Sequence, residues 1–131
     1  MDEKIITALE RQNPWWFNKH FETGIDRLAY YPYLERYMKS KEILLLLGTR
    51  RSGKSTLLNQ IINKLILNDA PRESIIFVNL DEPLFMAESH NANFLMDIVD
   101  YFSTKNRQLK KFYLFIDEVQ TVRIFYFFFK H

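Results

Sequence analysis

ILLLLGTRRSGKSTLLNQIINKLILN, residues 43–68, reads as a buried strand, a loop bounded by glycines and a helix. The aliphatic run Ile43–Leu47 is typical of a strand that is covered on both faces. After the loop, apolar residues recur at helical spacing: Leu57, Leu58, Ile61, Ile62 and Leu65. This order of elements predicts an α/β fold whose core starts with a strand, a tight turn and a helix.

The loop, GTRRSGKS, matches the phosphate-binding pattern G-x-x-x-x-G-K-[ST] at every fixed position. Gly48 and Gly53 allow backbone angles that a Cβ atom would forbid, so the loop can curl around a phosphate with its N–H groups inward. The alternative is a glycine turn without a ligand, which the strand–loop–helix context disfavours. We predict that nucleotide phosphates contact Gly48, Thr49, Arg50, Arg51, Ser52, Gly53, Lys54, Ser55 and Thr56.

Length and composition exclude several classes of protein. The 131 residues suffice for one domain, and the absence of cysteine excludes disulfides and thiolate metal sites. The net charge of +2 is too small to argue for nucleic acid. The N-terminus does not resemble a signal peptide, and no apolar run approaches the roughly 20 residues that span a bilayer. We therefore expect a soluble, cytoplasmic protein that does not associate with a membrane.

The N-terminal region predicts a short amphipathic helix over residues 1–13, which Pro14 ends. The aromatic triplet WWF at residues 15–17 has two interpretations. It can dock the N-terminal segment onto the core as an apolar plug, or it can stack on a nucleotide base. Because large aromatic side chains usually serve burial, we favour the plug.

Two further strands are predicted, at Ser74–Leu80 and at Phe112–Ile116, with a helix between them whose apolar residues run from Phe94 to Phe102. Alternating strands and helices indicate parallel βαβ units. The first of these strands ends at Asp81-Glu82, which either faces the ligand edge of the sheet or forms a solvated turn. We leave both interpretations open.

The strand Phe112–Ile116 runs into Asp117-Glu118, the acidic pair expected beside a phosphate loop. Asp117 would hold Mg²⁺, largely through its water shell, because this ion dehydrates reluctantly. Glu118 would polarise the water that attacks the γ-phosphate. Lys54 should reach the β- and γ-phosphates, and the Ser55 hydroxyl should ligate the same Mg²⁺.

Together, GTRRSGKS and FYLFIDEVQ at residues 112–120 resemble the AAA+ class of P-loop ATPases. The segments QNPWW at residues 12–16 and VNLDEP at residues 78–83 are also similar to archaeal and bacterial ATPases that carry a further C-terminal domain. The resemblance implies a three-layer P-loop NTPase-type parallel sheet with flanking helices, and ATP rather than GTP. It also implies roles for single residues: metal ligation by Ser55 and Asp117, catalysis by Glu118 and Lys54, and a helper at Gln120.

The C-terminus departs from the family, because Gln120 is followed by TVRIFYFFFKH where the family continues with a helix and another strand. We therefore predict three parts: an N-terminal helical segment packed on the core (1–40), a partial P-loop ATPase domain (41–120) and an atypical aromatic tail (121–131). The tail has no tight-turn residues near its start. We expect the strands Ile43–Leu47 and Phe112–Ile116 to lack their shared neighbour, and the chain to aggregate and to hydrolyse ATP poorly.

Three functions remain open at this point. The first is an ATPase with Mg²⁺ that acts on a protein client or through self-association. The second is a truncated module that binds ATP without hydrolysing it. The third is a DNA-associated ATPase, which ranks last because the basic clusters are short.

Overall fold

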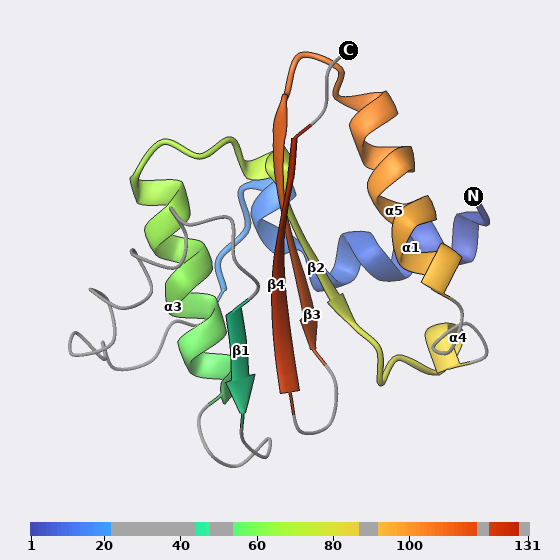
Figure 1. Ribbon diagram of the computed structural model, residues 1–131, viewed down its shortest axis with the longest axis horizontal. Helices are drawn as coiled ribbons and strands as arrows, with labels where there is room; N and C mark the ends of the chain where they lie inside the picture. The colour runs from blue at the N-terminus through green and yellow to red at the C-terminus, as the bar shows by residue number, and fades with distance from the viewer. Residues whose placement is uncertain (22–43, 48–53, 87–91, 118–120, 129–131) are drawn as a thin grey trace.

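The computed structural model describes residues 1–21, 44–47, 54–86, 92–117 and 121–128 (Figure 1). In the described part, a 3-10 turn follows the N-terminal helix, and helical segments connect β1 to β2 and β2 to β3. In chain order the elements are α1 (Glu3–Gln12), η1 (Pro14–Phe17), β1 (Leu44–Leu47), α3 (Lys54–Leu67), η4 (Arg72–Ser74), β2 (Ile75–Asn79), α4 (Pro83–Met86), α5 (Ala92–Lys105), β3 (Lys111–Asp117) and β4 (Thr121–Phe128).

The three predicted strands are present, each within one residue of its predicted ends. Together with β4 they form a four-stranded sheet in the order β1-β4-β3-β2. β2 pairs with β3 in parallel, as the alternation of strands and helices predicted. β4 is antiparallel to both β1 and β3, so β1, β2 and β3 all run in the same direction. The two predicted helices after the loop are also present, as α3 and α5.

The tail corrects the sequence prediction. Residues 121–128 form β4, which lies between β1 and β3 and pairs with both, so these strands do not lack a shared neighbour. The register places Ile124 opposite Leu44 on one side and opposite Phe115 on the other. An aromatic and β-branched run suits a strand, and a central position pairs backbone groups along both of its sides. The stabilisation from this pairing outweighs the lack of turn residues. Residues 118–120, which connect β3 to β4, lie outside the described part.

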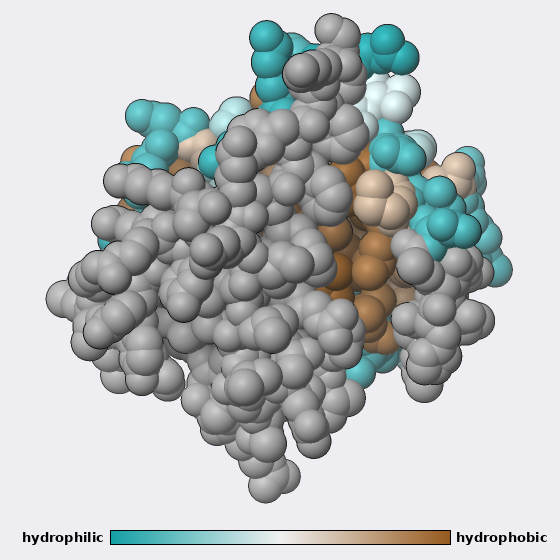
Figure 2. Space-filling view, viewed as in Figure 1, coloured by the Kyte–Doolittle hydropathy of each residue, from teal (hydrophilic) through white to brown (hydrophobic). Residues whose placement is uncertain are grey.

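Helices pack on both faces of the sheet (Figure 1). α5 and α1 contribute to one apolar cluster, in which Ile76, Val78 and Leu114 point from the strands. α3 contributes Leu58, Ile61 and Ile62 to a second cluster with Ile75 and Phe115. Alternate residues of β2 and β3 thus enter opposite clusters, as the two-residue period of a strand requires. In Figure 2, hydrophobic residues gather in a strip at the middle of the face, and hydrophilic residues lie towards its periphery.

The N-terminal helix begins and ends where its sequence indicates. The Asp2 side chain accepts a hydrogen bond from the Lys4 backbone N–H at 2.8 Å and caps the first turn of α1. The helix ends at Gln12, and Pro14 begins the η1 turn. Leu9 is fully buried on the inner face of α1, which attaches this helix to the core.

Two amide side chains cover the outer edge of β2, which is the last strand of the sheet. The Gln12 amide donates from Nε2 to the Asn79 carbonyl (3.3 Å) and accepts at Oε1 from the Asn79 N–H (2.9 Å). The Asn13 amide does the same at Phe77, accepting its N–H (2.7 Å) and donating to its carbonyl (2.9 Å). Each amide therefore replaces one residue of a neighbouring strand.

The tryptophan pair completes this cover at the start of β2. Both indole N–H groups donate to the Ile75 carbonyl, from Trp15 at 3.0 Å and from Trp16 at 2.8 Å. Trp15 is 1% exposed, and the Trp16 ring lies 4.7 Å from that of Phe102 between centroids. The two tryptophans are therefore the predicted plug, which is confirmed, whereas Phe17 is half exposed.

Candidate functional site

The carboxyl ends of β1 and β3 lie at the same end of the sheet, because the two strands run in the same direction. β1 ends at Leu47 and α3 begins at Lys54, with residues 48–53 of the predicted phosphate loop between them. In Figure 1, the start of α3 and the ends of these two strands lie at the lower side of the view. The structure thus brings the first turn of α3, with Lys54, Ser55 and Thr56, to the sheet end that carries Asp117.

Most of the predicted loop residues are not described. The residues Gly48, Thr49, Arg50, Arg51, Ser52 and Gly53 lie outside the described ranges, as do Glu118 and Gln120. Their predicted roles stay predictions. What the structure fixes is the backbone on either side of them: β1 before the loop, α3 after it and β3 before the acidic pair.

Asp117 is the last residue of β3 and is 7% exposed. Its carbonyl accepts the Leu80 N–H at 3.0 Å, which joins it to the end of β2. Asp117 shares a strand face with Phe115 and Tyr113, which pack in the cluster that contains α3. Asp117 is therefore on the face of the sheet that α3 covers, at the end where α3 starts.

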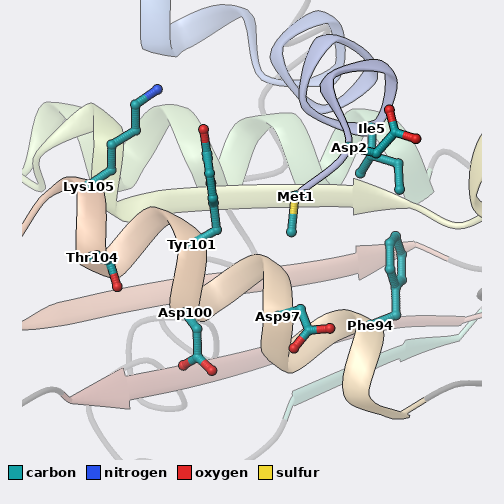
Figure 3. A pocket seen from close by; sticks show the side chains of 9 residues that line it. All are labelled: Met1, Asp2, Ile5, Phe94, Asp97, Asp100, Tyr101, Thr104 and Lys105. Carbon is teal, nitrogen blue, oxygen red and sulfur yellow. The ribbon is translucent and has the colours of Figure 1, made fainter.

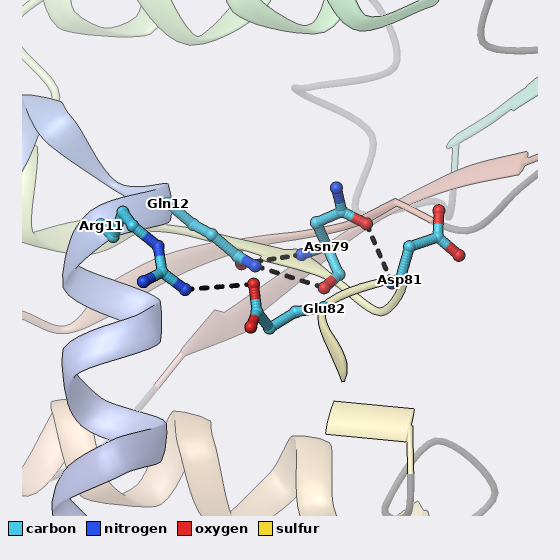
Figure 4. Close-up of polar contacts among 5 residues, drawn as sticks. All are labelled: Arg11, Gln12, Asn79, Asp81 and Glu82. Atoms are coloured by element: carbon cyan, nitrogen blue, oxygen red, sulfur yellow. Dashed lines mark hydrogen bonds and ion pairs between the residues drawn. The ribbon is translucent and has the colours of Figure 1, made fainter. Parts of the chain in front are cut away.

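The two acidic residues after β2, Asp81 and Glu82, make different contacts. The Glu82 carboxylate forms an ion pair with Arg11 and accepts its hydrogen bond at 3.1 Å, which connects the turn to α1. The Asp81 N–H donates to the Asn79 side chain at 3.0 Å, and the Asp81 carboxylate points away from the Arg11–Glu82 pair (Figure 4). Glu82 thus contributes to a structural contact. Asn79 at the end of β2 is the register partner of Asp117, and Asp81 follows Asn79 by two residues.

A surface cavity of about 590 Å³ lies elsewhere, between the N-terminus and α5 (Figure 3). Asp2, Ile5 and Phe94 line one part of it, and Tyr101 and Lys105 line another. None of the residues that line it belongs to the predicted nucleotide site. The cavity is therefore separate from the sheet end that carries Asp117.

Gln12 and Asn13 were predicted only as the end of a helix and as part of the resemblance at QNPWW, with no hydrogen-bonding role. The two amides and two indoles on either side of Pro14 are a sequence signal for backbone contacts, because all four side chains carry hydrogen-bonding groups. The partner strand is distant in sequence, so the run by itself does not identify β2.

A protein-family model described as an AAA domain matches residues 40–131, which is more than half of the chain. The chain belongs to this AAA domain family. Membership confirms the resemblance to AAA-type P-loop ATPases and associates the chain with nucleotide binding and ATPase activity. The match also runs through β4, the segment that the sequence analysis set apart as an atypical tail.

Searches of curated proteins and of solved structures found no match to this AAA domain. Within the described part of the chain, no helix is both long enough and apolar enough to cross a membrane. ATPases of the AAA family generally use ATP and Mg²⁺, which makes these the ligands to consider at the sheet end described above.

Proposed function

We propose that this AAA domain binds ATP with Mg²⁺ at the sheet end formed by β1, β3 and the first turn of α3, in a three-layer P-loop NTPase arrangement. One observation carries the proposal. α3 begins at Lys54, within the phosphate-binding pattern and directly after Gly53, at the strand end that carries the buried Asp117. A helix start that follows a glycine-bounded loop offers free N–H groups and a positive dipole end to an anion.

The proposed phosphate contacts come from the loop backbone between Gly48 and Gly53 and from the Lys54 ammonium group. Ser55 and Asp117 are the proposed metal ligands. A hydroxyl and a carboxylate are oxygen donors of the kind that Mg²⁺ prefers, so the residues present fit this ion. When bound, Mg²⁺ would neutralise charge on the β- and γ-phosphates.

Hydrolysis is the second half of the proposal. Glu118 follows Asp117 directly, and we assign to its carboxylate the proton of the attacking water. A carboxylate in this role must lie within hydrogen-bond reach of the water, close to the γ-phosphate. The position of Glu118, one residue after a strand end that faces α3, supports this assignment.

The test is Lys54→Ala in a binding titration with a fluorescent ATP analogue. Hydrogen bonds to charged groups contribute about 1.5–3 kcal/mol, so we expect the affinity to fall by roughly 10- to 100-fold. Lys110→Ala is the matched control, because Lys110 is an exposed lysine in the turn before β3 and should leave affinity unchanged. Equal affinity of folded Lys54→Ala and wild-type protein would show that the site lies elsewhere.

A further inference from the structure

The contact between Gln12 and Asn79 lies at the end of β2 that adjoins the proposed metal site (Figure 4). Asn79 is the last residue of β2, and its register partner in β3 is Asp117. Gln12 holds both backbone groups of Asn79 that point away from β3. The end of α1 is thereby attached to the strand position beside Asp117.

The residues after Asn79 connect this contact to Asp117. The next residue, Leu80, donates its N–H to the Asp117 carbonyl at 3.0 Å. The Asn79 side chain accepts the N–H of Asp81 at 3.0 Å, which orders the start of the turn. The Asn79 backbone is therefore bonded on its outer side by Gln12, its side chain bonds the Asp81 N–H, and the intervening Leu80 bonds Asp117. A displacement of Asn79 would shift the hydrogen bond that anchors the Asp117 backbone.

The neighbouring ion pair cannot replace this contact. The Arg11 side chain is 64% exposed and that of Glu82 is 20% exposed, at a separation of 3.1 Å. Solvent-exposed pairs of this kind contribute about 0–1 kcal/mol and are weakened by salt. The Gln12 amide makes two hydrogen bonds to a strand backbone, so it constrains the end of β2 more strongly than Arg11 does.

We infer that Gln12 is a positioning residue, which holds the β2–β3 end so that Asp117 is placed for Mg²⁺. The inference rests on the proposed function, and it concerns how the N-terminal segment affects the metal rather than the phosphates. Loss of the Gln12 contact should therefore weaken the effect of Mg²⁺ on nucleotide affinity and leave the Mg²⁺-free affinity unchanged. In the described part of the chain, both side-chain hydrogen bonds of Gln12 go to the Asn79 backbone.

The variant is Gln12→Met, which keeps the length of the side chain and removes both hydrogen bonds. ATP-analogue affinity is measured with and without Mg²⁺, and we expect the Mg²⁺ enhancement to fall by about two- to tenfold, the range of one net hydrogen bond. Two controls separate positioning from stability. Trp16→Phe removes an edge hydrogen bond at the far end of β2, and Ile98→Val removes a methyl group from the core under α5.

A second measurement needs no nucleotide. Amide hydrogen exchange of Leu80 should be faster in Gln12→Met than in wild type, and unchanged in Trp16→Phe. The inference is overturned if Gln12→Met keeps the full Mg²⁺ enhancement, or if all three variants lose it equally. If the wild-type chain binds no Mg²⁺ with ATP, the proposed function fails. The Leu80 exchange rate then decides by itself whether Gln12 holds the strand end.

Discussion

Replacing Asn13 with alanine removes three hydrogen bonds at a fully buried position. The Asn13 amide donates to the Leu9 carbonyl (2.6 Å) and the Phe77 carbonyl (2.9 Å), and it accepts the Phe77 N–H (2.7 Å). Alanine satisfies none of these groups, and the outer edge of β2 is covered too closely for water to replace the amide fully. The substitution therefore tests whether side chains substitute for an edge strand here.

The magnitude follows from these contacts. At about 1 kcal/mol net for each hydrogen bond, the free energy of unfolding should fall by about 3 kcal/mol. An unfolding entropy of about 2.1 cal/mol/K per residue over 131 residues corresponds to roughly 0.28 kcal/mol/K. The midpoint of thermal unfolding should therefore fall by roughly 10 °C.

Urea unfolding followed by far-ultraviolet circular dichroism measures the effect, with the slope of the transition expected to stay constant. Asn106→Ala is the matched control. The Asn106 side chain donates one hydrogen bond, to the Phe102 carbonyl at 2.9 Å, at the end of α5. It should cost about 1 kcal/mol. If Asn13→Ala costs no more than Asn106→Ala, the edge of β2 does not depend on the amide, and the argument for side-chain cover is refuted.

Two more substitutions have definite expected outcomes. Trp16→Phe should cost less than about 1 kcal/mol in a thermal melt, because the Trp15 indole still donates to the Ile75 carbonyl; a loss as large as that of Asn13→Ala would contradict this. Glu118→Gln should keep the affinity for ATP with Mg²⁺ and slow phosphate release by about 10²- to 10⁴-fold, because the amide cannot accept the proton; unchanged turnover would exclude Glu118 as the base.

The strands were predictable because their sequences are continuous apolar runs. Ile43–Leu47 and Ser74–Leu80 are each bounded by charged residues or glycine, and β1 and β2 start and end within one residue of them. Helix α3 was predictable from the spacing of its apolar residues after the loop motif. In these segments local periodicity and burial lead to the same structure, so the sequence suffices.

β4 was not predicted, because turn chemistry was given more weight than pairing. The absence of Gly, Asn, Asp or Pro near Thr121 argued against a tight return from β3. Turn residues concern the connection alone, whereas β4 pairs with β3 over residues 122–128 and with β1 over residues 121–124. The ladder with β3 extends to the pair of Lys111 with Phe128, and the ladder with β1 includes the pair of Leu47 with Thr121.

The contacts of Gln12 and Asn13 were out of reach for a different reason. Their partners Asn79 and Phe77 lie 67 and 64 residues further along the chain, and no periodic pattern connects them. The candidate site was predicted in part. The sequence identified the loop motif and the acidic strand end. The structure adds that the start of α3 and Asp117 lie at the same end of the sheet. The roles assigned to residues 48–56, Asp117 and Glu118 stay predictions.

The two features that sequence analysis missed solve one physical problem, which is the exposure of unpaired strand edges. β4 pairs the facing edges of β1 and β3, and the side chains of residues 12–16 cover the outer edge of β2. Among the described strands this leaves the outer side of β1, of which four residues are described, and the side of residues 125–128 in β4 that faces away from β3. Short edge strands are poor templates for pairing with another chain. The uncharged run Ile124–Phe128 of β4 pairs with β3 at every residue, and Ile124 also pairs with β1. Aggregation through the side of this run that pairs with β3 therefore requires the sheet to open first.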